Sequence, residues 1–234
     1  MKVLISGCSH SVRDYEATNG NGYFDLFAKH SGLEPIVVAE KGISNQNILD
    51  RVYDAIYTHN DIDTIIVQFT YLYRMSIWFK AVNDYIHFQP SLTHQSFEIE
   101  SWWTEQQLLK KFIGENDKRY YEFDKNDIVK TLSDFYQYYL VYGFDEEKEK
   151  QRIQIQLNIL KDICKQRGIK LITLWFDENE IEDETIVKVG DYISLHKWQI
   201  DNELYIGNKK FHLNTAGHIQ LENELLNKWQ SIQK

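Results

Sequence analysis

The chain has 234 residues, of which 43% are hydrophobic, 14% aromatic and 26% charged. This length and apolar content are typical of one large folded domain, and they exclude the disordered and low-complexity classes. The 26 Lys and Arg against 35 Asp and Glu give a formal net charge of −9, which repels a phosphate backbone and argues against general nucleic-acid binding.

The first third of the chain alternates predicted strands and helices. Short apolar runs indicate strands, and apolar residues at helical spacing indicate helices. Gly7 and Gly32 end the first strand and the first helix, and Ser44 is a good N-cap. The predicted elements, in chain order, are a strand at Lys2–Ser6, a helix at 21–30, a strand at Pro35–Ala39, a helix from Ser44 to about His59 and a strand at Ile62–Phe69.

Residues 71–143 break this alternation. They are rich in Tyr, Phe and Trp with charges interspersed, and they are too long for a loop. We predict a mostly helical insertion. Its aromatic residues either pack the insertion onto the main sheet or form a face that binds a sugar or a partner.

The last third returns to recognisable elements. A charged run opens a predicted helix at 145–167, and Ile169–Phe176 is predicted to be a fourth parallel strand. Residues 177–211 are expected to be irregular, with a short hairpin around 203–211. The final helix begins after Asn214 or Thr215 and runs to the C-terminus.

The succession of strand, helix and strand with short connections predicts an α/β fold, in which helices cover both faces of a parallel sheet. We therefore predict a single domain over residues 1–234 that carries the insertion at 71–143. No apolar stretch reaches the ~18–20 residues of a membrane span, and the N-terminus lacks the features of a signal peptide. Cys8 and Cys164 match neither a disulfide framework nor zinc spacing. We expect a cytoplasmic protein without metal or cofactor and without nucleic-acid or membrane partners, of open oligomeric state.

Ser9 is the first residue with predicted chemistry. It lies in the turn after the first strand, and ligands of open α/β sheets bind beyond the carboxyl ends of the strands. A serine on such a tight turn has an exposed hydroxyl and an amide near a helix start, which suits a nucleophile. The alternative is a turn of small residues without a chemical role.

Further polar residues follow the second and third strands. Gly42 allows a close approach of the backbone to a ligand, and Asn45 is able to donate to a developing oxyanion, although it also fits a helix cap. Gln68 and Thr70 reach the same edge of the sheet and are further candidates for oxyanion or substrate contacts. Arg74 is expected to bind an anionic group or to pair with an acid of the fold.

His212 precedes the last helix and is the predicted general base, because the ordinary pKa of histidine lies near neutrality. His218 is expected to be a residue of the first helical turn. His10, beside Ser9, is a further candidate, and the remaining histidines have no supporting context.

Together these segments resemble the SGNH (GDSL-type) hydrolase superfamily, in a divergent branch met in phage and bacterial genomes with Cys8 where Asp is usual. The matching segments are, in chain order, Gly7–Ser11, Gly42–Asn45, the turn with Thr70 and Arg74, and His212 before the last helix. The resemblance covers residues 1–75 and 165–234. It implies a three-layer α/β/α fold with a flavodoxin-like parallel sheet.

The sequence departs from the family pattern at two places. Thr70 stands where the family has an asparagine. Lys209–Lys210 stand three and two positions before His212, where an Asp normally fixes the imidazole tautomer. Either a backbone carbonyl orients His212 in a Ser–His dyad, or Asp177 or Asp201 replaces the acid, or the protein keeps only binding.

The resemblance implies a serine esterase or acyl hydrolase that acts on O-acyl or O-acetyl esters of a carbohydrate or small molecule. Ser9 attacks the acyl carbon and His212 takes its proton, while the amides of Ser9 and Gly42, helped by Asn45 or Thr70, hold the oxyanion. A binding module for a sugar or a protein partner, or an acyltransferase that uses the same residues, is the alternative. A nucleotide-binding role is disfavoured, because the first turn lacks a GxGxxG pattern.

Overall fold

The computed structural model describes residues 1–11, 22–79, 84–88, 125–177, 181, 183–206 and 209–232. Its centre is a parallel sheet in the order β2-β1-β3-β6. The four strands are β1 (Lys2–Ser6), β2 (Glu34–Val37), β3 (Ile62–Phe69) and β6 (Lys170–Trp175). Leu4 of β1 pairs with Ile36 on one side and with Ile65 on the other. The predicted α/β fold with a flavodoxin-like strand order is confirmed.

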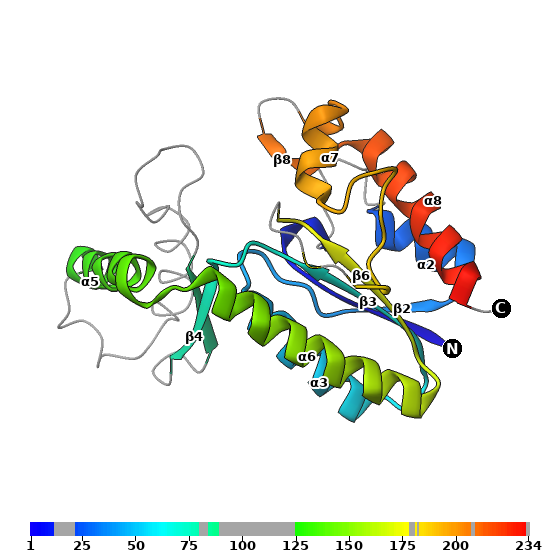
Figure 1. Ribbon diagram of the computed structural model, residues 1–234, viewed down its shortest axis with the longest axis horizontal. Helices are drawn as coiled ribbons and strands as arrows, with labels where there is room; N and C mark the ends of the chain where they lie inside the picture. Colours follow the sequence, from blue (N-terminus) through cyan, green and yellow to red (C-terminus); the bar gives the residue numbers. More distant parts are fainter. Residues whose placement is uncertain are drawn as a thin grey trace.

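Four long helices form the outer two layers of the three-layer fold. Helices α2 (Tyr23–Ser31) and α8 (Thr215–Ile232) cover one face of the sheet, and α3 (Asn45–Thr58) and α6 (Glu146–Arg167) cover the other (Figure 1). Each face has its own apolar cluster, because side chains alternate along the strands. Ile5 of β1 packs with α2 and α8, whereas its neighbour Leu4 packs with α3 and α6.

The helix ends follow from the residues that cap them. The Ser44 hydroxyl accepts a hydrogen bond from the amide of Asn47 at the start of α3, and Asp145 accepts one from Lys148 at the start of α6. Gly32 and Gly168 adopt the left-handed conformation directly after α2 and α6. The predicted helix boundaries are therefore correct to within a few residues.

The connection after β6 is more regular than predicted. The expected hairpin is present as β7 (Tyr205–Ile206) and β8 (Lys209–Leu213). Helix α7 (Leu195–Asp201) was not predicted. Its N-cap Ser194 accepts from the amide of Lys197 and donates to the carbonyl of Phe176, which fixes the helix to the end of β6.

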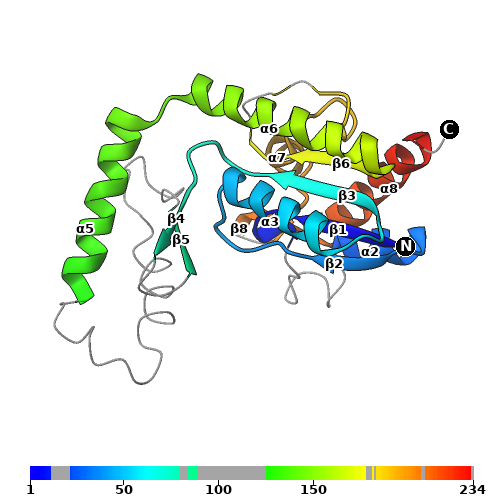
Figure 2. The ribbon, with the colours of Figure 1, turned by 90° about the horizontal axis from the view of Figure 1, so that it is seen from below.

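The insertion begins with strands rather than helices. Strands β4 (Met75–Phe79) and β5 (Asp84–Phe88) form an antiparallel pair, so the helical prediction is wrong for this part. Helix α5 (Lys125–Tyr138) and the π-helix Tyr139–Gly143 agree with it. The rest of the predicted insertion, at 80–83 and 89–124, lies outside the described residues. Figure 2 shows α5 and β4 beyond the end of the sheet to which β3 points.

None of the helices in the described ranges combines the length and the apolar character that crossing a membrane requires. Cys8 and Cys164 are both buried free thiols.

Candidate active site

Ser9 begins a short 3-10 helix, Ser9–Ser11, that follows β1 at the carboxyl edge of the sheet. The amide of Ser11 donates to the carbonyl of Cys8 at 2.9 Å, which closes the turn. Cys8, His10 and Ser11 are buried, whereas Ser9 is partly exposed. Ser9 is therefore the one partly exposed residue among Cys8–Ser11.

A buried hydrogen-bond network supports this turn from below. The Ser11 hydroxyl donates to Gln68 Oε1 at 2.8 Å and lies 2.6 Å from the Tyr23 hydroxyl. Gln68 Nε2 donates to Cys8 Sγ at 3.2 Å. The side chain of Gln68 is fully buried, and a contact of Gln68 with an oxyanion or substrate stays a prediction. Its role in this structure is to hold the serine turn.

His212 lies on β8, two residues before Asn214. The Asn214 side chain caps α8 by accepting a hydrogen bond from the amide of Gly217. Its Nε2 atom is 3.3 Å from Ser9 Oγ. The two residues are thus brought together across almost the whole chain. The distance is long for a hydrogen bond, which is common for a nucleophile and base without substrate.

The ring of His10 packs between two other rings of the site. It stacks on Phe176 at 3.9 Å between centroids and meets His212 edge to face at 4.9 Å. Burial, followed by the nearby charges of His212 and Arg74, holds the pKa of His10 well below its usual value of 6.5. A neutral His10 therefore lies against the predicted base at neutral pH. Phe176 was not predicted as part of the site.

His218 belongs to the scaffold, as expected. It is buried in the first turn of α8, and its Nδ1 accepts a hydrogen bond from the amide of Tyr23 at 3.0 Å. It therefore joins the starts of α2 and α8.

Asn45 connects the second and third loops of the site. Its Oδ1 accepts from the amide of Thr70 at 2.7 Å, and its Nδ2 donates to the carbonyls of Thr70 at 3.1 Å and Tyr71 at 3.4 Å. Its amide is thus directed to backbone, so in this structure the side chain is a clamp. Thr70 is fully buried, and its hydroxyl makes no hydrogen bond within the described ranges.

Gly42 adopts a left-handed conformation with φ of +76°, which favours glycine at this position of the second loop. The backbone amides of Gly42 and Ser9 make no hydrogen bond within the described part of the chain. Gly42 is buried and Ser9 is partly exposed.

The insertion reaches this loop through strands β4 and β5. The Ser76 hydroxyl accepts from the amide of Ser44 at 3.0 Å and lies 2.8 Å from Nδ1 of the buried His87. His87 Nε2 is 3.4 Å from a carboxylate oxygen of Glu40, an ion-pair distance rather than a well-formed hydrogen bond. Glu40 also pairs with Arg51 of α3.

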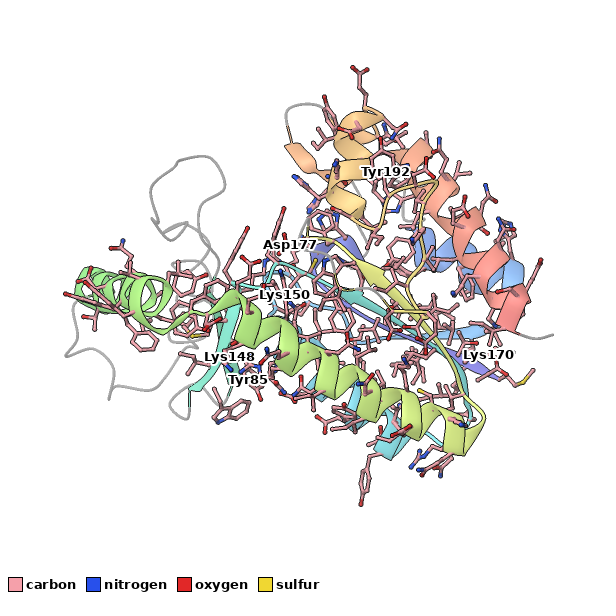
Figure 3. The ribbon with its side chains drawn as sticks, in the orientation of Figure 1. Tyr85, Lys148, Lys150, Lys170, Asp177 and Tyr192 are labelled. Atoms are coloured by element: carbon pink, nitrogen blue, oxygen red, sulfur yellow. The ribbon has the colours of Figure 1, made fainter. Side chains whose placement is uncertain are left out.

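The two predicted acids lie in different surroundings. Asp177 is buried and follows the carboxyl end of β6, whereas Lys170 lies at the other end of this strand (Figure 3). The Oδ2 atom of Asp177 accepts a hydrogen bond from the amide of Leu72 at 3.1 Å. Asp201 is exposed at the end of α7. Burial, followed by the nearby carboxylate of Asp201, raises the pKa of Tyr192, so Asp201 lies near that phenol. The side chains of Lys209–Lys210 lie outside the described residues.

Arg74 lies on the third loop, with its guanidinium carbon 5.3 Å from the centroid of the Tyr71 ring. Its Nε and Nη1 atoms are buried and have no hydrogen-bond partner within the described ranges. Among the described residues, no group of three or more His, Cys, Asp or Glu is placed to hold a metal ion.

No protein-family model and no curated protein matches the sequence. Among solved structures, the fold is similar to a member of the lipolytic protein G-D-S-L family from Veillonella parvula DSM 2008, with 13% identity, coverage of 97% of both chains and a TM-score of 0.38. It is also similar to LAE5, an alpha/beta hydrolase enzyme from the metagenome of Lake Arreo, Spain, with 13% identity, coverage of 97% of this chain and 94% of that chain, and a TM-score of 0.37. Similarity this low carries no argument about function, which therefore depends on the geometry of the site.

Proposed function

We propose that the protein is a serine hydrolase that cleaves O-acyl esters, such as O-acetyl esters of a carbohydrate or small molecule. The observation that carries this proposal is the position of the partly exposed residue Ser9, whose Oγ lies 3.3 Å from Nε2 of His212. A serine is a poor nucleophile unless a base takes its proton, and His212 is the one base at hydrogen-bond range of this hydroxyl within the described part of the chain.

In the proposed reaction, Ser9 Oγ attacks the acyl carbon while its proton passes to His212 Nε2. The oxyanion of the tetrahedral intermediate accepts from the amides of Ser9 and Gly42, which are unoccupied within the described ranges. When the intermediate collapses, His212 returns the proton to the leaving alcohol and an acyl-serine remains. Water, deprotonated by His212, then releases the acid and regenerates Ser9.

The protein also supplies the orientation of His212. The neutral ring of His10 packs against it, and the capped start of α8 fixes the strand that carries it. This packing restricts the rotation of the imidazole ring. The acid of a catalytic triad serves the same purpose as one part of its role. The same steps give acyl transfer if a second alcohol replaces water, so the products decide between the two reactions.

A fluorophosphonate probe tests the nucleophile directly. We expect covalent labelling of Ser9, and loss of 4-nitrophenyl acetate hydrolysis by about 10³-fold or more in Ser9→Ala and in His212→Ala. Ser231→Ala, an exposed serine of α8, is the control. A folded protein whose Ser9 stays unlabelled, or a Ser9→Ala variant as active as the parent, contradicts the proposal and favours a binding module.

A further inference from the structure

Arg74 is held at the edge of the candidate site by the turn that leaves β3. Its amide donates to the carbonyl of Tyr71 at 3.3 Å, and this turn folds the side chain back over the Tyr71 ring. Arg74 is therefore fixed at the carboxyl edge of the sheet, where ligands of α/β folds bind.

Two buried donors of the Arg74 guanidinium lack partners among the described residues. Within these ranges Nε and Nη1 have no hydrogen-bond acceptor, and no acid forms an ion pair with Arg74. Arginine stays charged at all physiological pH values, and leaving charged donors unsatisfied is expensive. Such a group calls for an explanation, and an anionic ligand would supply the missing acceptors together with a compensating charge.

The rings around Arg74 are neutral hydrogen-bond donors. Tyr71 and Tyr73 stack at 5.1 Å with an angle of 9° between their planes. Burial raises the pKa of both phenols, so they stay protonated. Asp177 is the nearby acid, and its carboxylate accepts from the amide of Leu72 instead of pairing with Arg74.

A continuous series of ring contacts joins Arg74 to the catalytic pair. Tyr71 meets the Phe176 ring edge to face at 5.4 Å, and Phe176 stacks on His10, which follows Ser9. The charge of Arg74 also contributes to the lowered pKa of His10, which supports their proximity. Arg74 thus belongs to a cluster of rings that extends to His10, the neighbour of Ser9 in sequence.

We infer that Arg74 binds an anionic group of the substrate, a carboxylate or a phosphate, and that the enzyme therefore prefers acidic esters to neutral ones. This inference rests on the proposed ester hydrolysis. A guanidinium binds both groups through two parallel hydrogen bonds, which gives orientation as well as affinity. Because the chain has a net charge of −9, a local cation is needed to attract such a substrate.

Two esters of similar length test the preference. 4-Nitrophenyl hemisuccinate carries a carboxylate, whereas 4-nitrophenyl butyrate is neutral. We expect Arg74→Gln to lower the ratio of kcat/KM for the first ester over the second by about tenfold or more, from the loss of charge-assisted hydrogen bonds. Arg152→Gln, an exposed arginine of α6, makes the same change in net charge and should keep the ratio.

Direct binding is measured in parallel by calorimetry with succinate and with inorganic phosphate, which separates the two anion classes. Arg74→Lys keeps the charge but loses the planar fork, and we expect it to restore part of the binding. If no ester is cleaved but either anion binds to the parent and not to Arg74→Gln, the hydrolase proposal fails and the anion site stands. If the ester ratio is unchanged in folded Arg74→Gln and neither anion binds the parent, the inference is overturned.

Discussion

Replacing Asn45 with Ala distinguishes a structural clamp from an oxyanion donor. In the structure, the Asn45 amide joins the start of α3 to the end of β3 through the backbone of Thr70 and Tyr71. A clamp contributes to the free energy of unfolding. An oxyanion donor contributes mainly to the rate of the chemical step.

The cost of the substitution follows from the groups that it leaves unpaired. The bonds at 2.7 Å and 3.1 Å are well formed and the one at 3.4 Å is weak, so two backbone groups of Thr70 lose a buried partner. Each such loss costs about 1–3 kcal/mol. We expect a destabilisation of about 3 kcal/mol, which for a chain of this size lowers Tm by about 6–12 °C.

Urea unfolding followed by circular dichroism measures this loss. Asn47→Ala is the matched control, because Asn47 is equally buried on the same helix and its Oδ1 has no hydrogen-bond partner within the described ranges. The control is expected to cost about 1 kcal/mol. If Asn45→Ala is as stable as the control and loses only kcat, the clamp is refuted and the oxyanion role stands.

Three further substitutions test the framework of the site. The parent should lose stability on acidification, because His10 takes up a proton in the unfolded chain below about pH 6.5 but not in the folded chain, where its pKa is lowered. His10→Gln should remove this part of the loss. Gly7→Ala should destabilise by about 2–3 kcal/mol and abolish phosphonate labelling, because its new Cβ would lie 2.5 Å from Ser11 Oγ. Ser76→Ala should cost about 1–3 kcal/mol and lower esterase activity, because the amide of Ser44 loses its acceptor.

Each of these has its own measurement and control. The stability of the parent and of His10→Gln is compared in urea from about pH 7.5 to pH 5.5, and parallel curves would show that His10 does not titrate as described. The charged or titratable groups that lower its pKa are His212, Arg74, His218 and His196. Gly7→Ala is followed by urea unfolding and labelling, and a stable, labelled variant contradicts the close approach. Ser76→Ala is compared with Ser231→Ala.

The sheet and its helices could be predicted because their signals are local. The strand at Ile62–Phe69 is an apolar run with the predicted bounds, and Ser44 and Gly168 mark helix ends by the chemistry of their own positions. Strands β4 and β5 could not, because their pairing depends on contacts such as that of Ser76 with the Ser44 amide. Helix α7 was missed for the same reason, since its N-cap Ser194 donates a hydrogen bond to the carbonyl of Phe176, which directly follows β6.

For the candidate site, sequence reasoning predicted which residue types gather at the edge of the sheet but not how their polar atoms are used. Ser9 Oγ and His212 Nε2 lie 3.3 Å apart, and both residues could be singled out because each follows or precedes a well-defined element. Gln68 lies at the same edge, but its side chain is fully buried. Side chains alternate between the two faces of a sheet, so the position of a residue at the edge does not tell how its polar atoms are used. Phe176 and Tyr71 carry no local signal of a site, and only their packing against His10 and Arg74 reveals one.

The described part of the insertion holds two loops of the candidate site through hydrogen bonds. Ser76 of β4 holds the amide of Ser44 in the second loop, and the hydroxyl of Tyr136 in α5 donates to the carbonyl of Tyr73 in the third loop at 2.7 Å. These two loops carry Gly42 and Arg74, the residues proposed for the oxyanion and for the substrate anion. Removing the insertion would therefore remove the hydrogen bonds that hold both loops.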